Sequence, residues 1–225
     1  MSPQAIVIWQ KLKRFCHAPL LNKAYNVSTL YYKTKGVVLY RLVFAKFGKG
    51  SYIRKPQLIL NPSYMSIGER VSIRDGARLE VVLTNSHRSP CLSIGSDTNI
   101  EQNVHIVCHS SIRIGNHASI TGYCAIVDVT HPFDNVDDTT KIGARIADEQ
   151  SFVEIGDYSF IGYGSVILPN VRIGTNVVIG ANSVVTTDVP DYSVAAGAPA
   201  VIIKQYDRKI GAWVRIPTRK CFSAH

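Results

Sequence analysis

The sequence of 225 residues predicts one domain with appendages, long enough to bury a substantial core. No stretch reaches the ~18 apolar residues that a membrane-spanning helix needs, and the apolar run at residues 5–9 is too short for a signal peptide. The 5 cysteines are odd in number and form no Cys-x-x-Cys pair, which predicts reduced thiols and a cytoplasmic protein.

Positive charge is concentrated in the first quarter of the chain. Residues 1–55 contain 11 Lys or Arg and no acidic residue, and the first acidic residue is Glu69. The remaining residues carry 14 basic and 16 acidic side chains, so the net charge of +9 belongs to the N-terminal segment. This asymmetry predicts an anionic partner, either a membrane surface or a phosphorylated ligand, although a solvated face without a partner has the same composition.

Residues 1–46 precede the repeats described below and are predicted to form a basic, helical extension. Residues 37–46 are apolar over most of their surface but include Arg41 and Lys46. Such a mixture suits an interfacial helix on an anionic leaflet, with a lipid-linked glycan as one reason for membrane contact. It equally suits a cap that covers exposed strand edges. No motif supports nucleic-acid binding.

A six-residue repeat organises the chain from residue 47 onward. Large apolar residues occupy its 18 repeat positions, 15 of which are Ile, and Gly follows directly at 8 of them. Four places after each position the side chain is usually small or β-branched. A period of six matches neither a helix nor a simple sheet, so it predicts short strands joined by tight turns. The positions are Phe47, Ile53, Ile59, Ile67, Ile73, Leu79, Ile94, Ile100, Ile106, Ile114, Ile120, Ile126, Ile155, Ile161, Ile167, Ile173, Ile179 and Val185.

The insertions between hexads show how the repeats are grouped. Extra residues occur only after every third hexad, with 2, 9, 2 and 23 residues at the first four such places and none at the fifth. Three hexads therefore form one triangular coil whose insertions leave at a single corner. The prediction is six stacked coils over residues 47–190, a loop excursion at 131–153, and a C-terminal turn and tail at 191–225.

These hexads, with the pattern [Ile/Val/Leu]-Gly-x-x-[Ser/Thr/Ala/Val]-x, and the closing segment 185–200 resemble those of the hexapeptide-repeat acyltransferases. The similarity covers residues 47–205 and is strongest to the branch of galactoside, maltose and nodulation-factor O-acetyltransferases and of O-antigen and capsule acetyltransferases. The resemblance implies an all-β fold, a left-handed parallel β-helix, despite the usual right-handed crossover rule. It also implies acetyl-CoA as cosubstrate, a saccharide acceptor, and a homotrimer with active sites between subunits.

His131 is the predicted catalytic residue. It lies where the regular hexads stop and the long excursion begins, and loops on a rigid scaffold commonly carry catalytic groups. The resemblance implies that His131, followed by Pro132, removes the proton from a sugar hydroxyl as the oxygen attacks the thioester. Transfer is then direct, without an acyl-enzyme. Asp128 is a candidate to orient His131, and a backbone carbonyl would serve as well.

The resemblance also points to acceptor-binding and cofactor-binding positions. Glu101 and His109 fall where galactoside enzymes have Asn and Asp, so the acceptor is expected to differ; Asn103 and His105 are nearby polar alternatives. Phe160 replaces a Trp and is expected to wall the thioester. The backbone N–H after the turn at residues 160–162 is a candidate for stabilising the oxyanion. The expected acetyl-CoA contacts are Phe160, Gly162, Tyr163, Gly180, Ala181, Thr186, Thr187 and Lys204.

Other function classes remain open at this stage. N-acetylation of an amino-sugar nucleotide uses the same fold and a similar base. A γ-type carbonic anhydrase would place three His on Zn²⁺, which His105, His109 and His117 suggest, but no His-x4-His pair is present and no metal is expected. A non-catalytic scaffold would bind no CoA. The predicted function is O-acetylation of a bacterial surface glycan or its precursor in the cytoplasm, with the inner face of the membrane as a candidate location.

Overall fold

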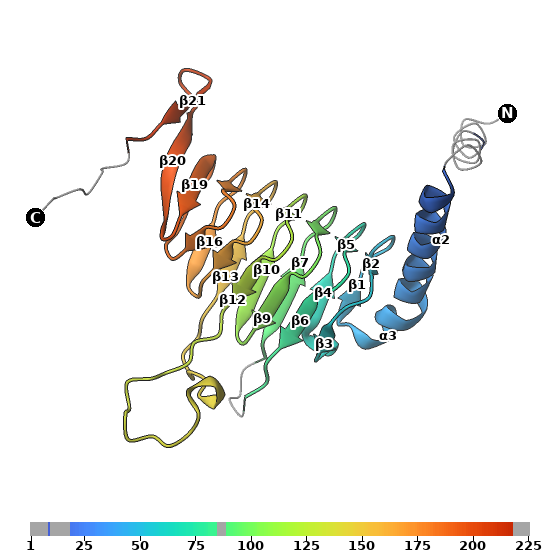
Figure 1. Cartoon of the computed structure of the whole chain (residues 1–225), viewed down its shortest axis with the longest axis horizontal. Coiled ribbons are helices and arrows are strands. Elements are labelled where there is room, and N and C mark those ends of the chain that lie inside the picture. Colours follow the sequence, from blue (N-terminus) through green and yellow to red (C-terminus); the bar gives the residue numbers. More distant parts are fainter. Residues whose placement is uncertain (1–8, 10–18, 85–88, 218–225) are drawn as a thin grey trace, which may run out of the picture.

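The chain folds into a triangular solenoid with a helix at one end and a hairpin at the other (Figure 1), as described by a computed structural model. The structure describes Trp9 and residues 19–84 and 89–217. Each coil contributes one short strand to each of three parallel sheets, which we name A, B and C. The chain passes from A to B to C and then returns to A one coil further along.

The three sheets contain all the strands of the described residues. Sheet A consists of β1 (Lys46–Phe47), β4 (Met65–Ile67), β7 (Cys91–Ile94), β10 (Ser111–Ile114), β13 (Val153–Ile155) and β16 (Val171–Ile173). Sheet B begins with β2 (Tyr52–Ile53), β5 (Ser72–Ile73), β8 (Asn99–Ile100), β11 (Ser119–Ile120), β14 (Phe160–Ile161) and β17 (Val178–Ile179). Sheet C consists of β3 (Leu58–Leu60), β6 (Arg78–Val81), β9 (His105–Cys108), β12 (Ala125–Val127), β15 (Val166–Ile167) and β18 (Val184–Val185).

The six-residue periodicity correctly predicts the register of the strands. In sheet B, Ile53, Ile73 and Ile100 are direct neighbours in successive coils, and the other two sheets stack their repeat positions in the same way. Almost all of these side chains are fully buried and form one continuous core. The prediction of six coils is confirmed, because sheets A and C have six strands each.

Close contact between coils explains the glycine that follows many repeat positions. A Cβ atom at Gly68 would lie 2.6 Å from the backbone nitrogen of Ser96 in the next coil, which is closer than atoms can approach. The turns also need left-handed backbone, which Gly would adopt most easily. Here non-glycine residues often supply it, including Arg70, His117 and Tyr158, with φ of 55°, 55° and 58°.

The N-terminal end of the solenoid is covered by helical segments. Helix α2 (Leu20–Lys35) continues into a π-helical turn, η1 (Gly36–Tyr40), and a short helix, α3 (Arg41–Val43). The rings of Tyr40 and Phe44 lie 5.3 Å from the ring of Phe47, the first repeat position of the core. These buried aromatic contacts cover the apolar core at its N-terminal end, where no further coil stacks on the first one.

The C-terminal segment differs from the predicted turn and tail. After the last coil, β19 (Ser193–Gly197) pairs with β17 and extends sheet B. It is followed by β20 (Ala200–Asp207) and β21 (Ala212–Arg215), which pair in antiparallel fashion and project beyond the coils. The hexad rule could not predict this hairpin because residues after 190 no longer follow the repeat.

All insertions leave the solenoid at the edge between sheets C and A, which we call the C–A edge. It carries the 3-10 helix η2 (Pro62–Tyr64) after the first coil and the long excursion at residues 128–152, which includes η3 (Ile142–Ala144). Figure 1 shows this excursion standing out from the lower edge of the molecule. Within the described part of the chain, no helix is both long enough and apolar enough to cross a membrane.

Candidate functional site

His131 lies at the start of the excursion, four residues after the end of β12. Its Nδ1 atom is 2.8 Å from the carbonyl oxygen of Arg145. Because a carbonyl oxygen only accepts hydrogen bonds, this contact places the proton on Nδ1 and leaves the lone pair on Nε2. The arrangement prepares Nε2 to accept a proton.

The side chain of Arg145 holds the excursion in place around His131. Its Nε atom donates to the carbonyl of Thr140 at 2.9 Å, Nη1 donates to that of Asn135 at 3.2 Å, and Nη2 donates to that of Asp138. Nε also lies 3.2 Å from the Asp138 carboxylate. Hydrogen bonds from Thr140, together with this positive charge, lower the pKa of Asp138 below its usual range, so the ion pair persists at neutral pH.

A cavity of about 430 Å³ lies over sheet C beside His131. Its walls include His131 and His105, and its charged end is formed by Arg78 and Glu80, which form an ion pair on β6. The other lining residues are mostly apolar: Val82, Val107, Val127, Val129, Gly143 and Ile146. A cavity with an apolar floor and a few directed polar groups is typical of a small-molecule site.

His105 is the only predicted acceptor-binding residue that shares the cavity with His131. It sits on β9, directly opposite Arg78 in the neighbouring coil. Partial burial lowers the pKa of His105, the positive charge of Arg78 lowers it further, and Glu80 opposes both effects. His105 is therefore neutral at pH 7 and can act as a hydrogen-bond donor or acceptor.

Asp128 does not orient His131, so this part of the sequence prediction is corrected. Its carboxylate is fully buried and accepts hydrogen bonds from the backbone N–H groups of His109, Ser110 and Ser111, the last two at 2.8 and 2.7 Å. His109 and Ser110 lie in the turn that follows β9, and Ser111 is the first residue of β10. The alternative expectation, a backbone carbonyl, is what contacts His131.

The other predicted acceptor residues lie away from the cavity. Glu101 is 3.6 Å from Arg74 at the edge between sheets B and C. Asn103 occupies a left-handed turn position at the same edge, with φ of 55°. His109 is buried, with Nε2 3.3 Å from Thr84 Oγ1. The triangular coil places Glu101 and Asn103 at a different edge from His131, whereas His109 lies at the C–A edge but its buried side chain does not line the cavity.

The predicted cofactor-binding residues fall in three places. Gly162, Tyr163, Gly180 and Ala181 follow β14 and β17 at the edge between sheets B and C, and Phe160 lies on β14 next to Val178. Thr186 and Thr187 are exposed directly after β18, and Lys204 is on β20 opposite Val194. Phe160, Tyr163 and Val178 are exposed apolar side chains, 44%, 50% and 37% accessible. Tyr123, which no repeat or motif singles out in the sequence, lies beside this group, with its ring 5.3 Å from that of Tyr163.

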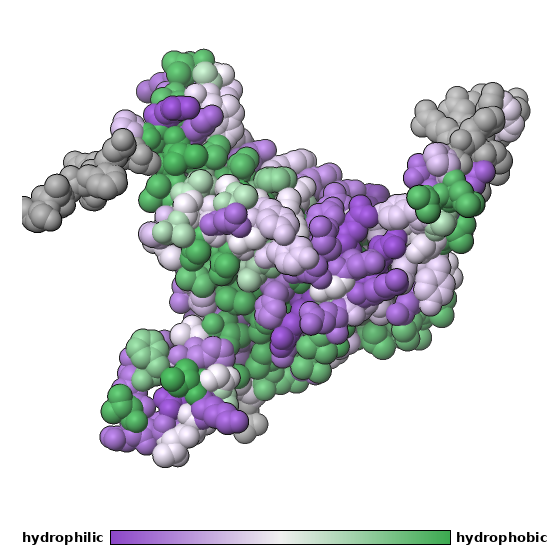
Figure 2. Space-filling view, viewed as in Figure 1, coloured by the Kyte–Doolittle hydropathy of each residue, from purple (hydrophilic) through white to green (hydrophobic). Residues whose placement is uncertain are grey.

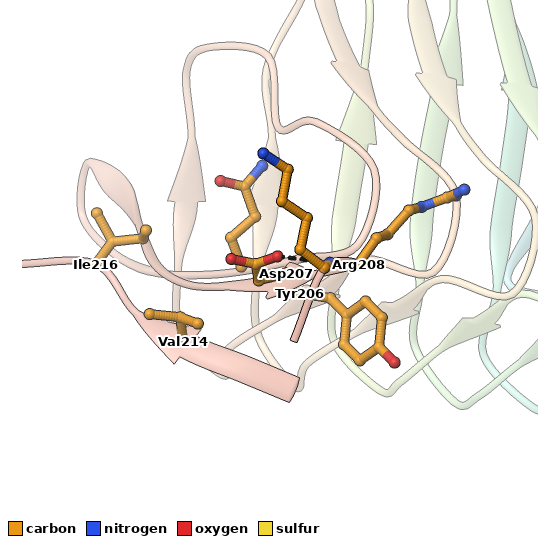
Figure 3. A pocket seen from close by; sticks show the side chains of 7 residues that line it. Tyr206, Asp207, Arg208, Val214 and Ile216 are labelled. Atoms are coloured by element: carbon orange, nitrogen blue, oxygen red, sulfur yellow. Dashed lines mark hydrogen bonds between the residues drawn. The ribbon is translucent and has the colours of Figure 1, made fainter. Parts of the chain in front are cut away.

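A second hollow, of about 420 Å³, lies on the C-terminal hairpin (Figure 3). The Asp207 carboxylate accepts a hydrogen bond from the Lys209 backbone N–H at 2.8 Å, which closes the turn. Arg208 extends toward the coils, with its guanidinium 4.8 Å from the centre of the Tyr192 ring. The hairpin thus places the Arg208 guanidinium, in addition to Lys204, as a cationic group near the last coils.

Neither metal binding nor reactive buried thiols are indicated by the described residues. In that part of the chain, no group of three His, Cys, Asp or Glu side chains could hold a metal ion. Cys108 and Cys124 are buried, and burial raises the pKa of both thiols, so they are core residues rather than nucleophiles.

Comparison with known proteins identifies the family. Residues 152–187 match the family model described as bacterial transferase hexapeptide (six repeats). Over 163 residues the chain is 31% identical to the galactoside O-acetyltransferase of Lactococcus lactis subsp. lactis (strain IL1403), covering 72% of this chain and 73% of that protein. The chain belongs to the hexapeptide-repeat acyltransferase family.

This acyltransferase is also similar to WbbJ of Escherichia coli (strain K12), a protein named as a lipopolysaccharide biosynthesis O-acetyl transferase. The identity is 29% over 197 residues, which cover 86% of this chain and 96% of WbbJ. Among solved structures, the N-acyltransferase AntD from Bacillus cereus, in complex with dTDP and 3-hydroxybutyryl-CoA, has a TM-score of 0.64 and 27% identity, covering 76% and 88% of the two chains. These similarities confirm the predicted left-handed parallel β-helix and the predicted enzyme class.

Proposed function

We propose that this acyltransferase transfers the acetyl group of acetyl-CoA to a hydroxyl group of a bacterial surface glycan or its precursor, with His131 as the general base. The observation that carries the proposal is the hydrogen bond from His131 Nδ1 to the Arg145 carbonyl, beside a cavity of about 430 Å³. It leaves Nε2 free to accept the proton of an acceptor hydroxyl.

In the proposed reaction, His131 Nε2 removes the hydroxyl proton while the acceptor oxygen bonds to the acetyl carbonyl carbon. The acetyl thioester supplies the acyl group, and its carbon–sulfur bond breaks. The imidazolium of His131 then returns the proton to the departing sulfur, so that an ester and a free thiol are formed. No residue of the chain becomes acylated. His105, which is neutral, and the Arg78–Glu80 pair would hydrogen-bond the other acceptor hydroxyls in the cavity.

Exposed late-coil residues fit an extended acyl-CoA. Phe160 and Val178 are neighbours on the outer face of sheet B, and the Tyr163 ring is exposed at the adjoining edge. We assign the pantetheine arm to this apolar strip and to the backbone after Gly162 and Gly180. Thr186, Thr187 and Lys204 would contact the part of acetyl-CoA that extends beyond the pantetheine arm. The apolar strip is on sheet B and the His131 cavity is on sheet C. A homotrimer in which sheet B of one subunit faces sheet C of its neighbour would therefore complete the site.

The test is release of free thiol from acetyl-CoA in the presence of a panel of saccharides. We expect release that depends on a hydroxylated acceptor and falls about 100-fold or more in His131→Ala. The matched control is His117→Ala, which removes an exposed His stacked on Tyr158 at another edge. Equal turnover by the wild type and His131→Ala would reject His131 as base.

N-acetylation of an amino-sugar nucleotide is the second candidate. It is favoured by the similarity to AntD, an N-acyltransferase whose structure contains dTDP. The same panel separates the two functions: if only amino-sugar nucleotides support thiol release, N-transfer replaces O-transfer. The cytoplasm, where acetyl-CoA and sugar nucleotides occur together, is the proposed location for either reaction.

A further inference from the structure

A cluster of aliphatic side chains is exposed where the chain enters the solenoid. Val37, Val38, Leu39, Leu42 and Val43 are 48%, 65%, 45%, 81% and 41% accessible. We call segment 37–43 the apolar turn. Figure 2 shows apolar surface, in green, along the lower edge of the molecule below β3 and α3. Isolated exposed aliphatic residues are ordinary, but five within seven positions mark a site of interaction.

The packing of the apolar turn keeps these side chains outside the core. Tyr40 and Phe44 are buried against Phe47, so the residues between and beside them point outward. Gly36 allows this segment to lie close to the first coil, because a Cβ at residue 36 would lie 2.8 Å from the Phe47 ring and 2.9 Å from the Ser51 carbonyl oxygen. The turn is therefore a fixed part of the fold whose apolar face has no partner within the described chain.

The charge around the apolar turn identifies the kind of partner. Residues 19–68 contain eight Lys or Arg and no Asp or Glu. Arg41 lies within the turn and Lys46 three residues beyond its end, and both are exposed. Exposed aliphatic residues flanked by basic residues are the features that bind the interface of an anionic bilayer.

The apolar turn lies on the same edge as the proposed active site. The N–H of Ala45 donates to the carbonyl of Pro62 at 3.3 Å, which ties the segment to the C–A edge of the first coil. His131 leaves that edge at the fourth coil, three strand spacings or ~14 Å further along the axis. The excursion exposes Phe133 and Val136 next to the carboxylates of Asp134 and Asp137, so the apolar turn, and not the excursion, supplies the contact with anionic lipid. In Figure 1 the excursion and α3 both stand at the lower edge.

We propose that the first-coil end of the C–A edge, where the apolar turn and its basic neighbours lie, binds an anionic lipid bilayer, with the apolar turn inserted among the headgroups. The His131 cavity then lies close to the membrane surface, which assigns to it an acceptor saccharide held there on a lipid carrier. The assignment of the acceptor rests on the proposed function, whereas membrane binding does not.

Co-sedimentation of the full-length protein with vesicles tests the binding. We expect it to bind phosphatidylcholine vesicles that contain phosphatidylglycerol, to bind vesicles of phosphatidylcholine alone weakly, and to dissociate as NaCl is raised. Leu42→Asp should reduce the partition coefficient about tenfold or more. Ile210→Asp is the matched control, since Ile210 is 64% accessible on the distant hairpin, and it should bind as the wild type does.

Failure to bind anionic vesicles, or equal binding by Leu42→Asp and the wild type, would overturn the inference. So would a change of oligomeric state in Leu42→Asp, seen by sedimentation velocity, because the turn would then be covered by a second copy of the chain. If a water-soluble glycan is acetylated in a His131-dependent way and vesicles are not bound, the proposed function stands and this inference falls. Stimulation of transfer to a lipid-linked saccharide by vesicles, lost in Leu42→Asp, would support both.

Discussion

The Nδ1 atom of His131 lies 2.8 Å from the carbonyl oxygen of Arg145, 14 residues further along the same excursion. The carbonyl is in place because the Arg145 guanidinium is anchored to Thr140, Asn135 and Asp138. Arg145 thus acts on His131 without reaching the cavity itself. Its side chain is a positioning group for the proposed base.

Removal of this anchor should affect turnover more than substrate binding. In Arg145→Ala we expect kcat to fall about 10- to 100-fold, because small displacements of a catalytic group have effects of that size. KM for both substrates should change little. Lys141→Ala, which removes an exposed cation from the same excursion, should behave as the wild type does. When His131 is already replaced by Ala, the Arg145→Ala substitution should cause no further decrease in kcat. A further decrease would show that Arg145 acts independently of His131.

Asp128 should contribute to stability rather than to catalysis. Asp128→Ala leaves one buried and two partly buried backbone N–H groups without an acceptor, which should lower the free energy of unfolding by about 3 kcal/mol. Chemical denaturation measures the change, with exposed Asp134→Ala as the control. The folded fraction of Asp128→Ala should retain kcat within about threefold. Normal stability combined with a 100-fold loss of kcat would instead restore Asp128 as the partner of the catalytic base.

The sequence predicted the core far better than the site, for physical reasons. The register of Ile53, Ile73 and Ile100 follows directly from a period of six, because each coil must stack the same apolar positions. Polar contacts do not share this period. The partners of Asp128 lie 17 to 19 residues earlier, one coil away, and the pattern does not reveal that its carboxylate turns inward. The contact between His131 and Arg145 depends on the irregular excursion, where no repeat applies.

His105 should make stability depend on pH below neutrality. Burial and the charge of Arg78 lower its pKa in the folded protein, so the unfolded chain binds a proton more readily. Stability due to neutral His105 is fully present above the unfolded pKa of ~6.5 and is lost as the pH falls toward the lower folded pKa. His105→Gln should therefore lose less stability between pH 7 and pH 5 than the wild type does. Parallel denaturation curves at several pH values would show the difference, and identical slopes would refute it.

Stacking of the coils should be most sensitive at the glycines that follow the repeat positions. In Gly68→Ala, the new Cβ would lie 2.6 Å from the Ser96 nitrogen and 2.8 Å from the Gly95 carbonyl carbon. Both are backbone atoms of the next coil, so neither can rotate away, and we expect a loss of about 2 kcal/mol or more in unfolding free energy. Gly143→Ala is the matched control because no atom lies within 4 Å of its added Cβ. Equal stability of the two variants, measured by thermal or chemical unfolding, would mean that the coils can separate without cost. Such separation would contradict a solenoid held together by continuous stacking from the first coil to the last.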